Sequence, residues 1–344
     1  MLRKIYIFIF SFLIVIGLVV GILFKEWIWG PNVKKDLKSY ELYIPTGSSY
    51  KDVLKELKDD RWLKNYASFR FVARMMQYNN EKVPPGKYVL EPGMSNRGLI
   101  SKIRAGKQTM VNITFNNVRF KENLAGKIAN YIEEDSLNIV GLLQNQEFCQ
   151  VRGLDTNTIM TLFIPNTYEF YWNTSALQLV RRMEKEHAKF WKAMDRMQKA
   201  DSLGLTKEEV FTLASIVEKE TLVNDERPEV AAVYLNRLKK GMLLQADPTV
   251  VYAVGDFSLR RVLNKHLKID SPYNTYVYSG LPPGPICMPD IGTIDAVLNP
   301  NNHNYIYFCA KPNGGGRHAF AKTLRGHMKN ARAYQSWLKS RNIR

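Results

Sequence analysis

Cysteine and histidine are scarce in this chain of 344 residues, which has three cysteines and five histidines. Cys149, Cys287 and Cys309 are odd in number and far apart, so they predict neither a disulfide framework nor a thiolate metal site. The histidines show no metal-ligand spacing, and no Gly-x-Ser-x-Gly or P-loop motif is present. We therefore expect no bound metal. Whether two of the cysteines form a bridge or all three are free thiols stays open.

Acidic residues are also in short supply, with 32 Asp and Glu against 49 Lys and Arg, for a formal net charge of +17. Such a surface suits nucleic acid, anionic lipid head groups or an acidic polymer. The chain lacks zinc-finger spacing, an RNP-like motif and an arginine-rich arm, which disfavours nucleic acid. It also lacks internal repeats and low-complexity runs. With 45% hydrophobic and 24% charged residues, its composition is that of globular domains.

Residues 5–24 form an apolar run without a charged side chain. A helix of this length matches the roughly 30 Å hydrocarbon core of a bilayer. Arg3 and Lys4 precede the run, which places the short N-terminus in the cytoplasm by the positive-inside rule, and Trp27 and Trp29 would anchor the far interface. The alternative is a cleaved signal peptide, but no small-x-small cleavage site is evident. We expect an uncleaved anchor with the rest of the chain outside the cytoplasm.

Beyond this anchor, the hydrophobic pattern predicts a mixed α+β protein. Strand and helix patterns alternate over a small unit, a mostly helical stretch follows, and the densest motifs come last. The predicted segments are 1–29 (cytoplasmic N-terminus and transmembrane signal anchor), 38–115 (small α+β module), 116–203 (helical connecting region) and 204–344 (larger α+β domain). Within the connecting region, residues 177–200 read as one long amphipathic helix, with His187 on its solvated face.

The last segment carries several polar motifs. Thr206 and Glu209 have the spacing of a capping box, which predicts the start of a helix. Asp247 precedes Pro248 and is therefore expected in a turn or an extended segment, as a second candidate carboxylate. "SPYNTYVYSG" offers amides and amphipathic rings of the kind that line glycan clefts. "NGGGRH" lies between two alternating runs, which indicates a hairpin turn rather than a phosphate loop.

The stretch "LASIVEKETL", residues 213–222, places Glu218 and Glu220 on a largely apolar helix. If they were the two carboxylates of a glycosidase, they would have to flank one glycosidic bond. Residues two apart on a helix point about 200° away from each other, so this pair cannot do so. If one is catalytic, the other needs a structural partner such as Arg227, Arg237 or Lys219. Helical geometry leaves the choice open, and it also allows two purely structural salt bridges.

Four motifs together resemble the bacterial endolytic murein transglycosylases (the MltG or YceG-like family). They are "LASIVEKET", "ERPEVAAVYLNRLKKGMLLQADPTVVYAVG", "SPYNTYVYSGLPPGPI" and "GGGRHAF", in the family's order and spacing from about residue 207 to the C-terminus. Upstream, "PPGKYVLEPGMSNRGLISKIRAGK" is similar to the family's LysM-like module, which identifies residues 38–115 with it. The resemblance makes residues 204–344 the expected catalytic domain.

The resemblance implies cleavage of β-1,4 bonds between N-acetylmuramic acid and N-acetylglucosamine in peptidoglycan, without a cofactor or a metal. The matching catalytic glutamate is Glu218, acting as a general acid and then as a base, so that 1,6-anhydro ends form. The expected substrate-binding or acid-orienting residues are Gln245, Asp247, Tyr273, Asn274, Thr275 and Tyr276. Glu220 and Arg227 are expected to give structural support.

These expectations describe a single-pass protein of the bacterial inner membrane with an extracytoplasmic catalytic domain. Its expected partners are peptidoglycan glycan strands, membrane lipid and peptidoglycan synthases, and nucleic acid is not expected. One rival hypothesis is a non-catalytic peptidoglycan-binding scaffold, against which the intact "ASIVEKET" and "LQADPTV" motifs argue. Another is a membrane-tethered nucleic-acid binder, which the predicted topology disfavours.

Overall fold

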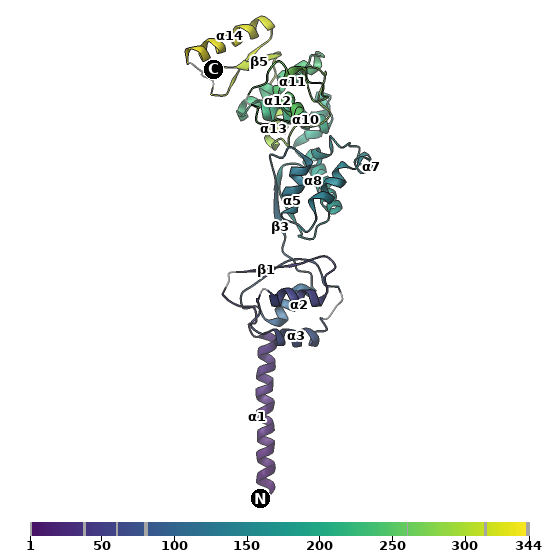
Figure 1. Cartoon of the computed structure of the whole chain (residues 1–344), viewed down its shortest axis with the longest axis vertical. Coiled ribbons are helices and arrows are strands. Elements are labelled where there is room, and N and C mark those ends of the chain that lie inside the picture. Colours follow the sequence, from purple (N-terminus) through teal and green to yellow (C-terminus); the bar gives the residue numbers. More distant parts are fainter. Residues whose placement is uncertain are drawn as a thin grey trace. The chain divides into compact units, whose positions relative to one another are not determined.

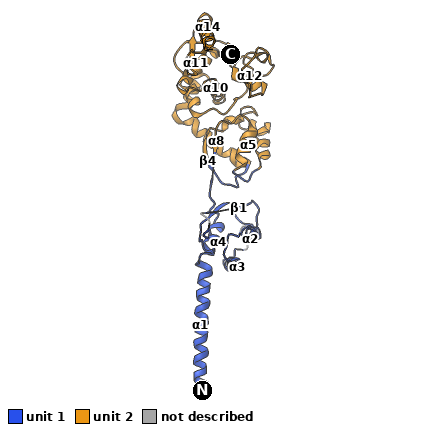
Figure 2. Ribbon diagram, turned by 60° about the vertical axis from the view of Figure 1, so that its left-hand side comes forward, with its two compact units in different colours: residues 1–113, 131–134, 169–175 blue, residues 114–130, 135–168, 176–344 orange. Residues whose placement is uncertain are grey.

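The structure is a computed structural model of the chain, and it describes residues 2–36, 39–59, 61–78, 82–259, 261–312 and 315–341. The chain divides into two compact units, which Figure 2 shows in different colours. Unit 1 consists of residues 1–113, 131–134 and 169–175, and unit 2 of residues 114–130, 135–168 and 176–344. The described residues form helices and short strands, which confirms the predicted mixed α+β class.

Helix α1 (Leu2–Trp29) is the predicted apolar N-terminal helix, drawn in purple in Figure 1. Its residues Arg3–Trp29 are long and apolar enough to cross a membrane, and the large apolar side chains along it are exposed. The end of the helix changes character, because Ile28 is buried in the core of unit 1. The Asn96 side-chain amide donates a hydrogen bond to the Trp27 carbonyl at 2.9 Å. The apolar helix thus enters the folded part of unit 1 directly.

The rest of unit 1 is built around a two-stranded antiparallel sheet. Its elements are β1 (Tyr40–Ile44), α2 (Tyr50–Asp59), α3 (Tyr66–Met75), β2 (Gly86–Leu90) and α4 (Asn96–Arg104). The register runs from Tyr40 opposite Leu90 to Ile44 opposite Gly86. Alternate residues of β1 are buried, as a strand with one face on a core requires.

Unit 2 holds most of the helices. The elements after α4 are β3 (Val111–Phe115), α5 (Lys121–Ala129), α6 (Ser136–Gln144), α7 (Gln146–Gln150), η1 (Ile159–Leu162), β4 (Asn166–Phe170), α8 (Ala176–Lys192), η2 (Ala193–Asp195), α9 (Arg196–Leu203), α10 (Lys207–Glu220), η3 (Asn224–Glu226), α11 (Arg227–Lys239), α12 (Asp247–Val254), η4 (His266–Lys268), α13 (Ile291–Leu298), β5 (Tyr307–Ala310), β6 (His318–Ala321) and α14 (Leu324–Ser340). Strands β3 and β4 pair with each other, and the chain passes between the units along both of them.

Helix α10 is the core helix of unit 2. Every residue from Val210 to Val217 is buried, so this stretch contacts protein on all sides. Its start has the predicted capping box: the Glu209 amide donates to the Thr206 hydroxyl at 3.1 Å, and the Thr206 amide donates to the Glu209 carboxylate at 2.8 Å. Helices α11, α12 and α13 pack against α10. The helix ends at Glu220, so both glutamates of "VEKE" lie in its last turn.

The prediction of a single long helix over residues 177–200 is wrong, because one short turn interrupts the helix. Helices α8 and α9 are separated by η2, in which Met194 and Asp195 have φ values of +57° and +55°. Left-handed residues cannot continue a right-handed helix. Apolar residues recur at helical spacing on both sides of the break, which is why the sequence pattern does not reveal it.

His187 is also not where the sequence predicts it. It lies in α8 four residues from Met183 and four from Trp191, on the buried side of the helix, and only 7% of it is exposed. Its ring is 6.1 Å from the ring of Trp191. Burial, together with the positive charge of Lys207, lowers the pKa of His187 to about 4. This histidine is a neutral core residue at neutral pH.

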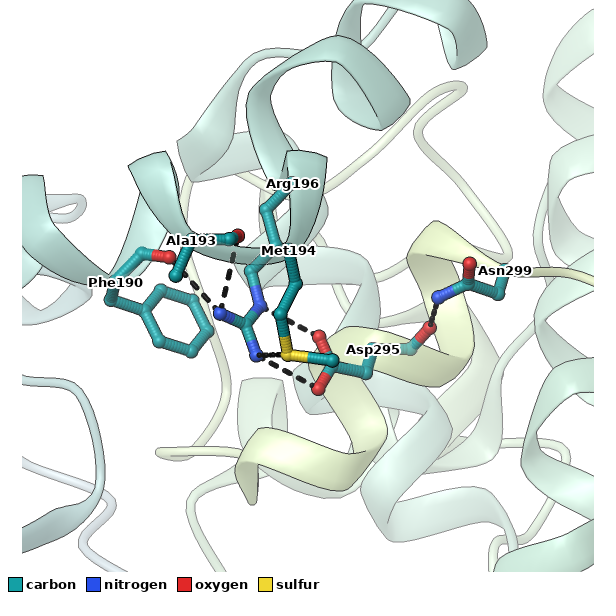
Figure 3. Close-up of polar contacts among 6 residues, drawn as sticks. All are labelled: Phe190, Ala193, Met194, Arg196, Asp295 and Asn299. Carbon is teal, nitrogen blue, oxygen red and sulfur yellow. Dashed lines mark hydrogen bonds and ion pairs between the residues drawn. The ribbon is translucent and has the colours of Figure 1, made fainter.

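Directly after the break between α8 and α9, the buried Arg196 forms an ion pair with the partly exposed Asp295, shown in Figure 3. Its guanidinium donates from Nε and Nη2 to the two carboxylate oxygens of Asp295, at 2.7 and 3.0 Å. The same group donates to the main-chain carbonyls of Phe190 and Ala193, and it lies 4.0 Å from the centre of the Phe190 ring. The pair ties the end of α8 to α13, whose residue Thr293 donates a hydrogen bond to Glu218 of α10.

The predicted C-terminal hairpin is present. Strands β5 and β6 pair antiparallel, from Tyr307 opposite Ala321 to Ala310 opposite His318. Residues 313–314 of the predicted turn lie outside the described residues. The three cysteines are free thiols in this structure, with Cys149 and Cys287 buried and Cys309 partly exposed.

Candidate active site

The carboxylate of Glu218 is held by three donors from neighbouring elements of unit 2. Arg227 Nη2 donates to Oε1 at 3.2 Å, the Asp290 amide donates to Oε2 at 3.3 Å, and the Thr293 hydroxyl donates to the same oxygen. The side chains of Glu218 and Arg227 are only 15% and 9% exposed. These contacts fasten the last turn of α10 to α11 and α13.

Glu220 lies in the same turn but meets a different environment. The residue is partly exposed, whereas its Oε2 is buried and has no hydrogen-bond partner among the described residues. Burial and the negative charge of Asp247 raise the pKa of Glu220 to about 7, against a hydrogen bond from Tyr234 and the positive charge of Arg237. A carboxyl group that titrates near neutral pH can both donate and accept a proton in one catalytic cycle.

Two cavities of unit 2 share Glu220 and Asp247 as lining residues. The larger cavity has a volume of about 530 Å³ and extends along α12 to Phe257 and Arg119. The smaller one, of about 380 Å³, is also lined by Gln245 and by residues of α11 and the β5–β6 hairpin. Glu218 does not belong to the lining of either cavity among the described residues. Space on both sides of one carboxyl group suits an extended polymer that runs past it.

The structure brings three of the predicted substrate-binding residues to this site. Gln245, Asp247 and Tyr276 all line the smaller cavity together with Glu220. The Tyr276 hydroxyl donates to Asp247 Oδ1 at 2.6 Å, which fixes the orientation of that carboxylate. Gln245 has a φ of +50°, a conformation that costs free energy for any residue with a side chain and that occurs often at functional sites.

Two other predicted residues are buried and stabilise the loop that carries Tyr276. Asn274 donates to two carbonyls of the preceding loop and accepts a hydrogen bond from the Tyr276 amide at 3.0 Å. The Thr275 hydroxyl accepts from the Ala246 amide at 3.0 Å and lies 2.8 Å from the Thr249 hydroxyl. Asn274 therefore shapes the loop of residues 271–280 (the tyrosine loop), and Thr275 binds that loop to the start of α12.

The sixth predicted residue, Tyr273, supports the wall of the larger cavity through a neighbour. Its ring centre lies 4.7 Å from that of Tyr252, which lines the cavity. Arg119 and Phe257 complete this part of the wall, with the guanidinium 3.6 Å from the centre of the phenyl ring. Tyr252, Phe257 and Arg119 are not among the site residues predicted from the sequence. The aromatic residues around "VVYAVGDF" were the available signal for the first two.

Asp247 differs from its predicted conformation. The Asp-Pro pair predicts a turn or an extended segment, but α12 begins at Asp247 and Ala246 is the extended residue before it. Proline is tolerated in the first helical turn, because the amides there have no partner within the helix. The helix N-terminus in turn favours the negative charge of Asp247.

Helix α11 contributes a polar pair to the smaller cavity. Tyr234 and Arg237 lie three residues apart on one face of the helix and both line the cavity beside Glu220. Arg237 is mostly buried and donates to the carbonyls of Leu244 and Ile306, at 2.7 Å each. From the sequence, Arg227, Arg237 and Lys219 are the candidate partners of whichever glutamate is not catalytic. Of these, Arg227 pairs with Glu218.

Across the described ranges of the chain, no group of three or more His, Cys, Asp and Glu side chains is arranged to hold a metal ion.

Comparison with known proteins identifies the family. The sequence matches the YceG-like family over residues 42–333. It is 31% identical over 327 residues to the endolytic murein transglycosylase of Bacillus subtilis strain 168, covering 90% of this chain and 88% of the relative. It is 26% identical to the endolytic murein transglycosylase of Streptococcus pneumoniae strain D39, of which the alignment spans only 53%. The crystal structure of a YceG-like protein from Listeria monocytogenes superposes with a TM-score of 0.55 at 28% identity, covering 85% of this chain and 98% of that one. This chain belongs to the YceG-like family.

Proposed function

We propose that this protein is a membrane-anchored lytic transglycosylase that cuts within peptidoglycan glycan strands. It cleaves the β-1,4 bond between N-acetylmuramic acid and N-acetylglucosamine and leaves 1,6-anhydro ends. The names of the relatives support the reaction class. The observation that carries the proposal is a carboxyl group with a pKa of about 7, placed between two cavities large enough for sugar units.

We assign the catalytic acid to Glu220. The sequence resemblance assigned this role to Glu218 and gave Glu220 a supporting one, and Glu218 stays the competing candidate. The cavity lining supports Glu220, because a catalytic acid has to reach the glycosidic oxygen. The three donors on the Glu218 carboxylate suit a fastening role, since they come from the elements that pack against α10.

The reaction follows from one carboxyl group used twice. Protonated Glu220 donates its proton to the oxygen that leaves from C1 of N-acetylmuramic acid, and positive charge develops at C1. The resulting carboxylate then takes the proton of the C6 hydroxyl of the same sugar as that oxygen attacks C1. The products are an anhydro ring on one strand and a free C4 hydroxyl on the other. The glutamate ends the cycle protonated.

Asp247 and Tyr276 prepare Glu220 for this cycle. The negative charge of Asp247 keeps the proton on Glu220, and Tyr276 orients Asp247 by its hydrogen bond. Gln245 provides an exposed amide in the smaller cavity, where it can bind hydroxyl or acetamido groups of a sugar. Tyr252, supported by Tyr273, offers an aromatic wall on the other side.

A second candidate function is hydrolysis of the same bond. Asp247 lines the same two cavities as Glu220, so a second carboxylate is available to activate a water molecule. Hydrolysis would leave a reducing end in place of the anhydro ring. We favour the transglycosylase reaction because Tyr276 already engages Asp247.

The remaining parts of the proposal concern location and partners. We propose that α1 anchors the protein in the inner membrane with its N-terminus in the cytoplasm, and that residues 38–115 act as a LysM-like glycan-binding module ahead of a catalytic domain at 204–344. Residues 116–203 would connect the two. The protein would then work on glycan strands close to the membrane lipid and the peptidoglycan synthases.

Product analysis tests the function. The full-length protein in detergent micelles is incubated with uncrosslinked glycan strands, and the new ends are identified by mass spectrometry. Anhydro ends inside former strands are expected. New reducing ends would establish the hydrolase, and intact strands would favour a non-catalytic binding scaffold.

A further inference from the structure

A third cavity of unit 2 carries a cluster of positive charge beside the proposed active site. It has a volume of about 400 Å³, and its lining includes Arg119, Lys127 and Lys219. The lining also includes the side-chain amides of Asn116, Asn117 and Asn123, and it includes no aspartate or glutamate among the described residues. Three cations and three amides around one cavity form a site for an anion.

The three cations are positioned by neutral groups. Lys127 donates to the Asn116 side-chain carbonyl at 2.7 Å, and Lys219 donates to that of Asn117 at 3.2 Å. Arg119 lies over the ring of Phe257. An amide or a phenyl ring orients a cation without neutralising it, so the positive charge of each side chain remains available to a ligand.

The cationic cavity is connected to the active site by shared residues. Arg119 and Lys219 line both this cavity and the 530 Å³ cavity beside Glu220. Lys219 is also the chain neighbour of Glu220. Lys127, in contrast, lines the cationic cavity and does not belong to the lining of the two active-site cavities among the described residues. An anion bound here would therefore lie next to the sugar whose bond is cleaved.

We propose that this cavity binds a carboxylate of the peptide branch on the glycan strand, so that the enzyme prefers strands that carry peptides over bare strands. The inference rests on the proposed function, because it takes the strand to pass Glu220. The peptide branch is attached to the N-acetylmuramic acid unit itself and carries free carboxylates, so it lies within reach of a neighbouring cavity. The pyrophosphate of a lipid-linked strand is present only at the strand's end, far from most internal bonds.

Two substrates that differ only in the peptide test this inference. Uncrosslinked strands are compared with the same strands after an amidase has removed their peptides, and kcat/KM is measured for both with the full-length protein. Wild-type protein should prefer the peptide-bearing strands. Lys127→Gln should lower kcat/KM for these strands by about fivefold to tenfold, the worth of one charge-assisted contact, and leave the bare strands unaffected.

The controls separate the possible causes. Lys127→Arg keeps the charge and should keep the preference, whereas Lys189→Gln removes an exposed charge on α8 and should change neither rate. An equal loss on both substrates, or no loss on either, would overturn the peptide subsite while leaving the transglycosylase proposal intact. Inhibition by inorganic pyrophosphate that Lys127→Gln relieves, with the peptide preference unchanged, would assign the cavity to a phosphate group. If wild-type protein cut neither substrate, both the proposed function and the peptide subsite would be contradicted.

Discussion

Glu218 and Glu220 are separated by one residue in the last turn of α10, yet their carboxylates lie in different environments. Glu218 accepts hydrogen bonds from Arg227, Thr293 and the Asp290 amide, whereas Glu220 lines two cavities with a buried oxygen that has no partner among the described residues. An α-helix turns each successive residue by about 100°, so residues two apart face away from each other. One carboxylate therefore fastens the helix and the other faces two cavities.

The pH dependence of catalysis should follow Glu220. The general acid has to be protonated in the free enzyme, so kcat/KM should fall as the pH rises through about 7, the pKa that burial and Asp247 give to Glu220. A pH–rate profile on soluble glycan strands measures this limb. If Glu220 sets the alkaline limb, the limb should be absent from the profile of Glu220→Gln. A wild-type kcat/KM that does not change between pH 6 and 9 would contradict the assignment.

Removing the charge of Asp247 should move this alkaline limb to lower pH. The negative charge of Asp247 raises the pKa of Glu220, so Asp247→Asn should lower it, by roughly one pH unit or less for a charge at a partly solvated site. Asp201→Asn removes an exposed charge on α9 and serves as the matched control, with no shift expected. An unchanged limb in Asp247→Asn would mean that this charge does not act on the catalytic group.

Protonation of Glu220 should also make the free energy of unfolding depend on pH. The folded pKa of Glu220, about 7, lies above its ordinary value of 4.5, so the folded state binds more protons than the unfolded state between these pH values. The contribution to the free energy of unfolding is full below pH 4.5 and is lost as the pH rises through 7. Glu220→Gln should therefore be more stable than wild type at pH 8, by on the order of 2 kcal/mol, and similar to it at pH 4.5.

Urea titrations at the two pH values measure this difference. Glu147→Gln changes an exposed glutamate of α7 in the same way and should leave stability unchanged at both. Equal stability of Glu220→Gln and wild type at pH 8 would show that the carboxylate is well solvated.

Glu218→Gln should have the opposite effect on stability. Removing the charge leaves the mostly buried Arg227 without its ionic partner, which should cost about 2 to 4 kcal/mol at neutral pH. Thr293→Val replaces threonine by a side chain of nearly equal size that lacks the donor hydroxyl, and it should cost about 1 kcal/mol. Thermal unfolding followed by circular dichroism measures both. A Glu218→Gln protein as stable as wild type would remove the fastening role.

Much of the fold could be predicted from local signals. The Thr206–Glu209 capping box, the apolar N-terminal helix and the β5–β6 hairpin each depend on residues close together in the sequence. The break at Met194 and Asp195 could not be predicted, because the helical spacing of apolar residues continues across it and the adjoining Arg196–Asp295 pair joins residues about a hundred positions apart.

The candidate site, too, could be predicted only in part from local sequence. Helical periodicity could show that Glu218 and Glu220 face different directions, but which direction meets a cavity depends on α12, the tyrosine loop and the hairpin, all distant in sequence. Asn274 and Thr275 lie within the motif that predicted the site, yet their side chains are buried and bind main chain. A motif marks the segment, and only packing decides which of its side chains meet the substrate.

The most direct test of the account is the product spectrum of two matched variants. Glu220→Gln and Glu218→Gln are incubated as full-length proteins with uncrosslinked glycan strands, at a temperature where circular dichroism shows both folded, and anhydro ends are counted by mass spectrometry. The account predicts that Glu220→Gln forms anhydro ends at least a hundredfold more slowly than wild type, as loss of a general acid requires, while Glu218→Gln retains activity within about tenfold. Loss of anhydro ends in Glu218→Gln with normal products from Glu220→Gln would contradict it and restore Glu218 as the catalytic acid.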